Sequence, residues 1–244
     1  MGKEMFQVST LQALALGYFE SVISVGELLQ HGDTGLGTFK NVDGEMVVLD
    51  GKCFRADHTG HIVPAPDDMG VPFAAVSDIG GGYEYDIGQT DNIEKLKELL
   101  TVKIEEDFGL NSMHIVRIDG VFEKIDARSE SAFYNSYVGH TELKEALSKT
   151  QKDFHFENVS GSMVCVYFPD YMDGINAAGW HLHFASSDRK LGGHVFGLKM
   201  TSGKATIRKI SNIELSLPTS AAFDTYALKS ASQNDIKEVE QGKQ

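Results

Sequence analysis

A series of short β-rich runs, separated by glycine-containing turn signals, constrains the fold of this chain more than any other feature. Between residues 37 and 65 the signals Asp43-Gly44, Asp50-Gly51 and Thr59-Gly60 separate the runs GTFKN, EMVVL, KCFRA and HIVPA. Asp-Gly pairs flanked by β-forming residues are typical of the tight turns that join antiparallel strands. We therefore expect an antiparallel meander here, followed by a further strand within residues 72–79.

Helices are expected at three places in this strand-rich pattern. In residues 91–108 and again in residues 141–150, apolar side chains recur at helical spacing while charged side chains fill the other face. A shorter helix is expected after Ser24, because Ser24 and Glu27 have the spacing of a capping box. The remaining segments are strand-like, in the runs MHIVRIDG and VFEKIDAR around Asp119-Gly120, and then in HFENVSG, SMVCVYF, GWHLHFA, GGHVFGLKM and KATIRKISNIELSL.

The coarse order of elements is helix, strands, helix, strands, helix, strands, with few strands in a βαβ rhythm. This order predicts an α+β protein with two β-rich halves, mainly antiparallel or mixed sheets and a few short helices. We place the boundary beside the last of the three helices. Residues 1–140 would form an N-terminal mixed α/β-sheet domain, and residues 141–244 a C-terminal β-rich domain that contains His181, His183 and His194 and ends in a polar tail.

The formal charge of the chain, −13 at pH 7, argues against a broad basic face that binds nucleic acid or anionic membranes. No apolar stretch approaches the roughly 20 residues that span a bilayer, and the N-terminus lacks the apolar segment of a signal peptide. We therefore expect a cytoplasmic protein. Cys53 and Cys165 form no thiol-rich metal motif, and we expect both to be reduced.

Three histidines in the last third of the chain are the strongest candidate site. In the run GWHLHF, a strand would place His181 and His183 on the same face, because side chains alternate between faces. The following segment ASSDRKLGG is rich in turn-forming residues. A hairpin at this point would return His194 beside the first two histidines.

Three neutral imidazoles with an open fourth position are the donor set of a catalytic zinc site, which polarises an oxygen atom or activates water. The spacing alone leaves two alternatives open. The histidines are buried residues of an aromatic-rich strand, or they belong to an iron site in which Asp188 supplies the carboxylate. A closed structural zinc site is disfavoured, because no cysteine accompanies the histidines.

The sequence GWHLHFASSDRKLGGHV, residues 179–195, resembles the metal-binding signature of the α-acetolactate decarboxylase family. In that signature a glycine, an aromatic residue and a His-x-His pair with phenylalanine precede an acidic turn and G-G-H-V. Residues 27–52 resemble the family's N-terminal helix–hairpin block, and RIDGVFEKIDARS, residues 117–129, resembles the block with its active-site arginine. The similarity runs through roughly residues 10–240.

The resemblance implies a two-domain, usually dimeric zinc enzyme that converts 2-acetolactate to acetoin and carbon dioxide. It also implies site residues, position by position: zinc ligands His181, His183 and His194, an active-site glutamate at Glu45 with Thr38 nearby, an arginine at Arg128 and a second glutamate at Glu240. The chain departs from the family pattern after the arginine. The run SESAFYNSY stands where the family often has proline and glutamine.

The chemistry of a β-keto acid gives each of these groups a role. Loss of carbon dioxide leaves an electron pair in an enediolate, and zinc as a Lewis acid would receive that charge as an electron sink. Arg128 would hold the leaving carboxylate or an adjacent oxygen. Glu45 and Glu240, or Glu238 in place of Glu240, would protonate one face of the enediolate, because burial beside a second carboxylate raises a pKa.

Without the resemblance, these residues have ordinary interpretations. Glu45 is then a solvated hairpin residue, Thr38 a strand residue, and Arg128 the partner of Asp126 or Glu130 in a surface ion pair. Two other functions also remain. A cupin-like iron dioxygenase uses His-x-His on a strand but normally adds a glutamate shortly afterwards, where this chain reads FASSDR. A metal-dependent small-molecule binding module would show no turnover.

Overall fold

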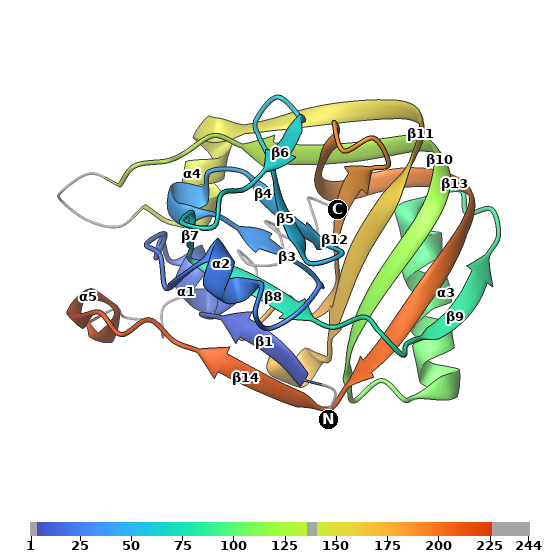
Figure 1. The fold of residues 1–244 in the computed structure, drawn as a ribbon, viewed down its shortest axis with the longest axis horizontal. Coiled ribbons are helices and arrows are strands. Elements are labelled where there is room, and N and C mark those ends of the chain that lie inside the picture. Colours follow the sequence, from blue (N-terminus) through green and yellow to red (C-terminus); the bar gives the residue numbers. More distant parts are fainter. Residues whose placement is uncertain (1–3, 136–140, 226–244) are drawn as a thin grey trace.

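The computed structural model of the protein describes residues 4–135 and 141–225. Its larger sheet has seven strands (Figure 1). Neighbouring strands in this sheet are antiparallel except the edge pair β14 and β1, which are parallel. In spatial order the strands are β14 (Asn212–Ser216), β1 (Glu4–Val8), β8 (Phe73–Ser77), β3 (Thr34–Thr38), β4 (Glu45–Leu49), β5 (Lys52–Ala56) and β6 (Ile62–Pro64).

The second sheet has five strands and is fully antiparallel. In addition to its linear order, its fourth strand pairs with its first, so that four strands form a closed ring of hydrogen-bonded neighbours. A separate two-stranded ribbon joins β2 (Ile23–Ser24) and β7 (Gly70–Val71). The five strands in order are β10 (Met113–Glu130), β11 (Gln151–Phe168), β12 (Gly179–Ser186), β13 (Gly192–Ile210) and β9 (Tyr83–Ile87).

Long strands replace some of the breaks that the sequence suggests. β10 continues through Asp119-Gly120, because both residues pair with β11 on one side and with β13 on the other. Strand pairing on both sides satisfies the hydrogen-bonding groups of the backbone here. This pairing outweighs the local turn preference of Asp-Gly. β11 likewise continues through Gly161, where a β-carbon would lie 2.4 Å from the ring of Phe184. That glycine allows close packing and makes no turn.

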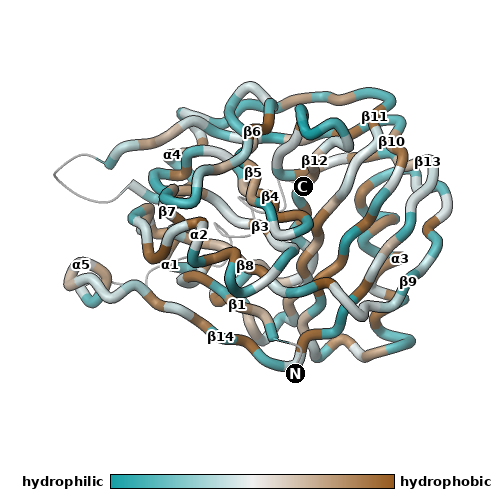
Figure 2. The backbone as a smooth tube through the Cα atoms, viewed as in Figure 1, coloured by the Kyte–Doolittle hydropathy of each residue, from teal (hydrophilic) through white to brown (hydrophobic). Residues whose placement is uncertain are grey.

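The two sheets pack face to face, and helices cover their outer faces (Figure 1). The helix α3 (Ile93–Asp107) covers the five-stranded sheet, with Asn92 as its N-cap. The helix α2 (Val25–Leu28) packs on the outer face of the seven-stranded sheet. Figure 2 shows both hydrophobic and hydrophilic residues along β13, and the buried side chains of this strand include Leu198, Met200, Ala205 and Ile207.

Most predicted elements are confirmed. α3 and α4 (Leu143–Thr150) lie where the amphipathic pattern predicts them. Ser24 caps α2 in a capping box with Glu27. The predicted order of elements was wrong at the beginning of the chain, because the strand β1 precedes the first helix α1 (Leu11–Ala15). The short helix α5 (Ala221–Asp224) was not predicted, and its four residues are too few to give a periodic signal.

The α+β fold class is confirmed by this architecture. The division of the chain near residue 140 stays a prediction; β10 and β11, which precede and follow it, pair along nearly their whole lengths.

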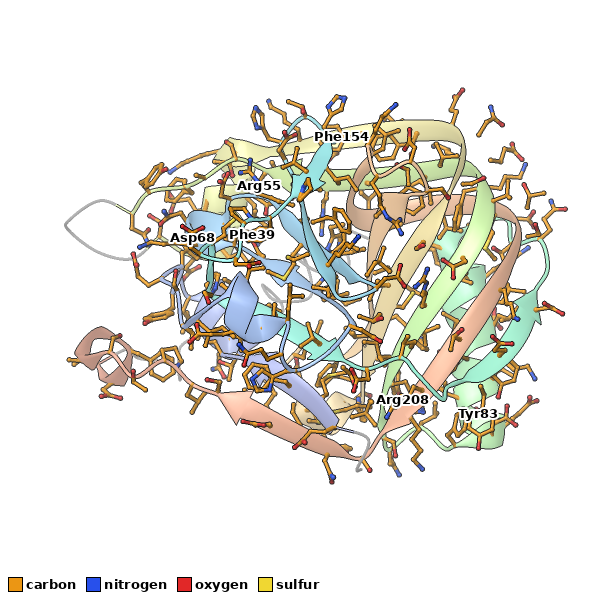
Figure 3. All side chains as sticks on the ribbon, in the orientation of Figure 1. Phe39, Arg55, Asp68, Tyr83, Phe154 and Arg208 are labelled. Atoms are coloured by element: carbon orange, nitrogen blue, oxygen red, sulfur yellow. The ribbon has the colours of Figure 1, made fainter. Side chains whose placement is uncertain are left out.

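Arg208 on β13 donates hydrogen bonds to the carbonyls of Asp78 and Gly80 (Figure 3). These bonds connect the segment before β9 to β13. No helix within the described residues is long and apolar enough to cross a membrane.

His114 on β10 gives the fold a specific acid sensitivity. Its side chain is fully buried beside Phe108 and Tyr167, with ring centroids 5.6 and 5.9 Å away. Burial, which disfavours the charged imidazolium, lowers the pKa of His114 from 6.5 to about 4. Between these two values the unfolded chain takes up a proton that the folded chain does not. Stability contributed by neutral His114 is therefore lost as the pH falls from 6.5 to 4.

We expect His114 to account for a loss of about 2 kcal/mol in unfolding free energy between pH 7 and pH 5. The variant His114→Phe should show a smaller loss over this range by about that amount. Urea unfolding of both proteins at the two pH values measures the difference. The variant His58→Gln, at an exposed position, is the control and should behave like the parent. Equal pH dependence in the parent and His114→Phe would contradict the assignment.

Candidate active site

The predicted histidine hairpin is present. In β12 the residues Trp180, Leu182 and Phe184 face the core under α3, which turns His181 and His183 toward the seven-stranded sheet. His183 lies directly opposite His194 in the antiparallel register of β12 and β13. All three histidine side chains are buried. The alternation of side chains along β12 and the hairpin between β12 and β13 therefore bring the three imidazoles together.

The ring nitrogens of the three histidines converge. His181 Nε2 lies 2.9 Å from His183 Nε2 and 3.1 Å from His194 Nδ1. Four ligands around zinc at 2.0–2.1 Å in a tetrahedron are separated by about 3.3 Å. The observed separations are close to that value. Within the described residues, these histidines are the group whose ligand atoms could share one metal ion.

The surroundings keep the imidazoles of His181 and His183 neutral and fix the orientation of the second. Burial lowers the pKa of His181 to about 3, and the positive charges of Arg128 and Lys97 act in the same direction. Burial, with His181 and Arg128 nearby, also holds the pKa of His183 well below its usual value. His183 Nδ1 donates to the carbonyl of Met46 at 2.7 Å, so its Nε2 lone pair is free for a metal.

Arg128 lies beside the histidine cluster because of sheet pairing. Arg128 on β10 is opposite His194 on β13 in the register of the five-stranded sheet. Its guanidinium Nη2 is 3.2 Å from His194 Nε2. The side chain is half-buried. A fixed positive charge thus stands next to the proposed metal ligands, where it can meet an anionic substrate.

Thr38 and Glu45 approach the histidines from the seven-stranded sheet. They form a directly opposed pair at the turn between β3 and β4. Thr38 Oγ1 donates to the carbonyl of Gly44 at 2.9 Å, which braces this turn. Glu45 Oε2 lies 3.4 Å from His183 Nε2. The glutamate predicted from the hairpin block is therefore not a solvated residue but part of the histidine site.

One cavity, with an empty volume of about 430 Å³ including its opening, joins these groups. It has one polar part and one apolar part. The polar lining includes Thr38, Glu45, Arg128, Glu130, Gln151, His181 and His194, and the apolar lining consists of Leu14, Val42, Phe73, Leu143 and Leu147 beside Gly37.

Sequence reasoning missed the cavity role of Glu130 and of the apolar wall. Glu130 was considered only as a surface partner of Arg128, but it is 3% exposed and lines the cavity. The alternation of a strand was an available signal, since residues 128 and 130 share a face. Leu143 and Leu147 are on the apolar face of α4, a pattern that gave no indication of what this face would cover.

Other predicted residues lie away from the cavity or outside the described part of the chain. Glu240 and the neighbouring Glu238 are in the segment after residue 225, so their contribution stays a prediction. Cys53 and Cys165 are buried free thiols, and burial raises the pKa of Cys53 to about 12. Asp188 is exposed in the turn between β12 and β13, where its carboxylate accepts a hydrogen bond from Ser186 Oγ.

Comparison with known sequences decides the family. The sequence profile of alpha-acetolactate decarboxylase matches residues 5–230. The chain belongs to the alpha-acetolactate decarboxylase family. Its relatives include the alpha-acetolactate decarboxylase of Methanosarcina mazei, 35% identical over 236 residues that cover 97% of this chain and 80% of that protein. The alpha-acetolactate decarboxylase of Lactococcus lactis is also 35% identical, over 93% of this chain and 95% of that protein.

Solved structures agree with this membership of the alpha-acetolactate decarboxylase family. The crystal structure of alpha-acetolactate decarboxylase from Bacillus subtilis superimposes with a TM-score of 0.91 at 29% sequence identity. The match covers 98% of this chain and all of that chain. The family expected from the histidine signature is therefore confirmed, and so is the β-rich fold that it implies.

Proposed function

We propose that this decarboxylase converts 2-acetolactate to acetoin and carbon dioxide with a zinc ion held by His181, His183 and His194. The observation that supports this most strongly is the convergence of three buried imidazoles beside a cavity that Arg128 and Glu45 line. The donor set fits zinc, since three imidazoles and no thiolate leave the ion its charge and an open position. Family membership supplies the substrate.

The position of Asp188 argues against the iron site that the sequence left open. A facial iron site needs one carboxylate with two histidines. Asp188, the carboxylate considered for that role, points to solvent in the hairpin turn and is hydrogen-bonded to Ser186. Bound zinc would supply Lewis acidity toward oxygen atoms of the substrate.

The reaction breaks the bond between the carboxylate carbon and its neighbour. Carbon dioxide leaves, the electron pair stays on the remaining skeleton as an enediolate, and one proton completes acetoin. Arg128 would orient the substrate carboxylate through charge-assisted hydrogen bonds. Arg128 must not bind the substrate carboxylate equally strongly in the ground state and in the transition state. Equal binding of the two states lowers KM without raising kcat.

Glu45 is the proposed source of the proton. Its carboxylate adjoins His183 at one wall of the cavity, and protonation from this side alone would give a stereoselective product. Thr38 would keep the turn that carries Glu45 in place through its bond to Gly44. In this proposal a second carboxylate, from Glu240, would favour the protonated form of Glu45.

The apolar wall has a role in binding. Acetolactate carries two methyl groups, and Leu14, Phe73 and Leu147 offer them a water-poor surface opposite the polar groups. Excluding water there strengthens the contacts of Arg128 and Glu45 with substrate, since electrostatic interactions grow in a low dielectric. The homodimer, the cytoplasmic location and the two-domain division remain predictions beside this proposal.

The metal requirement gives the first test. Prolonged chelation should remove the zinc and abolish acetoin formation from racemic acetolactate, and added zinc should restore both. Metal content is measured by plasma mass spectrometry and acetoin by a colour assay. Full activity in protein verified to be metal-free would contradict the proposal. Iron in the protein as isolated, with oxygen consumption, would favour the dioxygenase, and metal binding without turnover would favour a binding module.

A further inference from the structure

We infer that Ser129 is a positioning residue that holds Glu45 in place relative to Arg128. The inference rests on the proposed function, because it assigns Ser129 a role through the catalytic glutamate. Ser129 lies on β10 between two cavity residues, Arg128 and Glu130, and its side chain is fully buried. Because side chains alternate along a strand, its hydroxyl is directed away from the face that those two neighbours share.

The hydroxyl of Ser129 makes two hydrogen bonds to the other sheet. Its Oγ accepts from the backbone N–H of Glu45 at 3.2 Å and donates to the carbonyl of Ala56 at 2.7 Å. Glu45 and Ala56 are opposed residues at the end of the ladder between β4 and β5. One hydroxyl therefore bridges a donor and an acceptor that face each other, and fixes both to β10.

The backbone at this point leaves little freedom for another arrangement. Gly44, directly before Glu45, has a φ of +94°, and a β-carbon there would lie 2.3 Å from the carbonyl of Ala56. The turn is thus pressed against β5, and the N–H of Glu45 is directed at Ser129. Without the hydroxyl, the N–H of Glu45 and the carbonyl of Ala56 would each lose one hydrogen bond to β10, and the end of β4 could shift relative to that strand.

The bridge matters for chemistry because the two proposed catalytic groups come from different sheets. Glu45 belongs to the seven-stranded sheet and contacts His183, whereas Arg128 belongs to the five-stranded sheet and contacts His194. Ser129 is adjacent to Arg128 in the chain and bonded to Glu45. It therefore sets the separation between the carboxylate that gives the proton and the guanidinium that holds the substrate.

A double-mutant cycle tests this role. The variant Ser129→Ala should keep full zinc content and lower kcat by about tenfold or more, because a displacement near 1 Å of a reacting group costs up to about 10²-fold. In the background of Glu45→Gln the same change should lower kcat by less than about twofold, since interacting residues are not additive. Ser129→Thr keeps the hydroxyl and should retain most of the rate. If the threonine variant does not fold, Ser129→Cys is used in its place.

Ser162→Ala is the matched control. Ser162 is a buried serine of the same sheet whose Oγ donates to Asp119 at 2.6 Å, and it does not line the cavity. It should lose stability similar to Ser129→Ala and keep the parent's kcat. Equal rate losses from Ser129→Ala in the parent and in Glu45→Gln would overturn the inference. An inactive parent would instead overturn the proposed function, so the two failures are distinguishable.

Discussion

Replacing His183 with glutamine is expected to remove the bound zinc and to reduce acetoin formation to the background rate. His183 is the most deeply placed of the three histidines, with a fully buried side chain and an Nε2 directed at His181. Two imidazoles alone leave zinc with too few protein ligands for a stable site. The amide of glutamine is also a poor zinc ligand beside two imidazoles, so both affinity and activity should fall together.

Metal content and turnover of His183→Gln should be measured on the same preparation, with circular dichroism to show that the fold persists. His155→Gln is the matched control, because His155 is an exposed histidine on β11 that pairs with Asp126. This control should keep the zinc and the parent's rate. Stoichiometric zinc with parental activity in His183→Gln would contradict the assignment of this histidine as a ligand.

Replacing Glu45 with glutamine is expected to have the second-largest effect and a different signature. The amide keeps the size of the carboxylate and cannot supply the proton. The rate should fall by about 10² to 10⁴-fold, the usual contribution of a general acid or base. Zinc content should stay near that of the parent, because Glu45 lies beside the ligand His183 without belonging to the histidine group. A loss confined to kcat, with KM little changed, would fit a group that acts in the transition state.

Steady-state kinetics with zinc-loaded protein measure the effect of Glu45→Gln. Glu123→Gln is the control, since Glu123 is an exposed carboxylate paired with Lys199 and should be neutral to the rate. Glu240→Gln completes the comparison, and we expect its rate loss to differ from that of Glu45→Gln. Parental rates in both glutamine variants would contradict the proposed acid pair. Loss of zinc from Glu45→Gln would show that this carboxylate supports the metal instead.

The parts of the site that follow from local sequence pattern were predictable. The His-x-His pair, the turn-rich segment after it and the returning His194 needed only the period of a strand and one hairpin. The strands β4 and β5 are where the turn signals Asp43-Gly44 and Asp50-Gly51 place them. In each case the deciding contacts are between residues close together in the chain.

The parts that depend on distant contacts were not predictable from the sequence. Asp119-Gly120 carries a turn signal, but pairing with β11 and β13 keeps it in a strand. Glu130 is a charged residue of a type that is usually exposed, but it is buried and lines the cavity together with Leu143 and Leu147 of α4. Ser129 gave no signal, because its two partners are 84 and 73 positions away in the sequence.

The closed ring of strands has a consequence for how the enzyme acquires its parts during folding. His181 and His194 are 13 positions apart, whereas Arg128 is 66 positions from His194. The cost of loop closure rises with the length of chain between two contacts, and contacts between distant residues form slowly. His181 and His194, two of the proposed metal ligands, therefore come together in one local hairpin, whereas Arg128 joins them only when the distant strands β10 and β13 have paired.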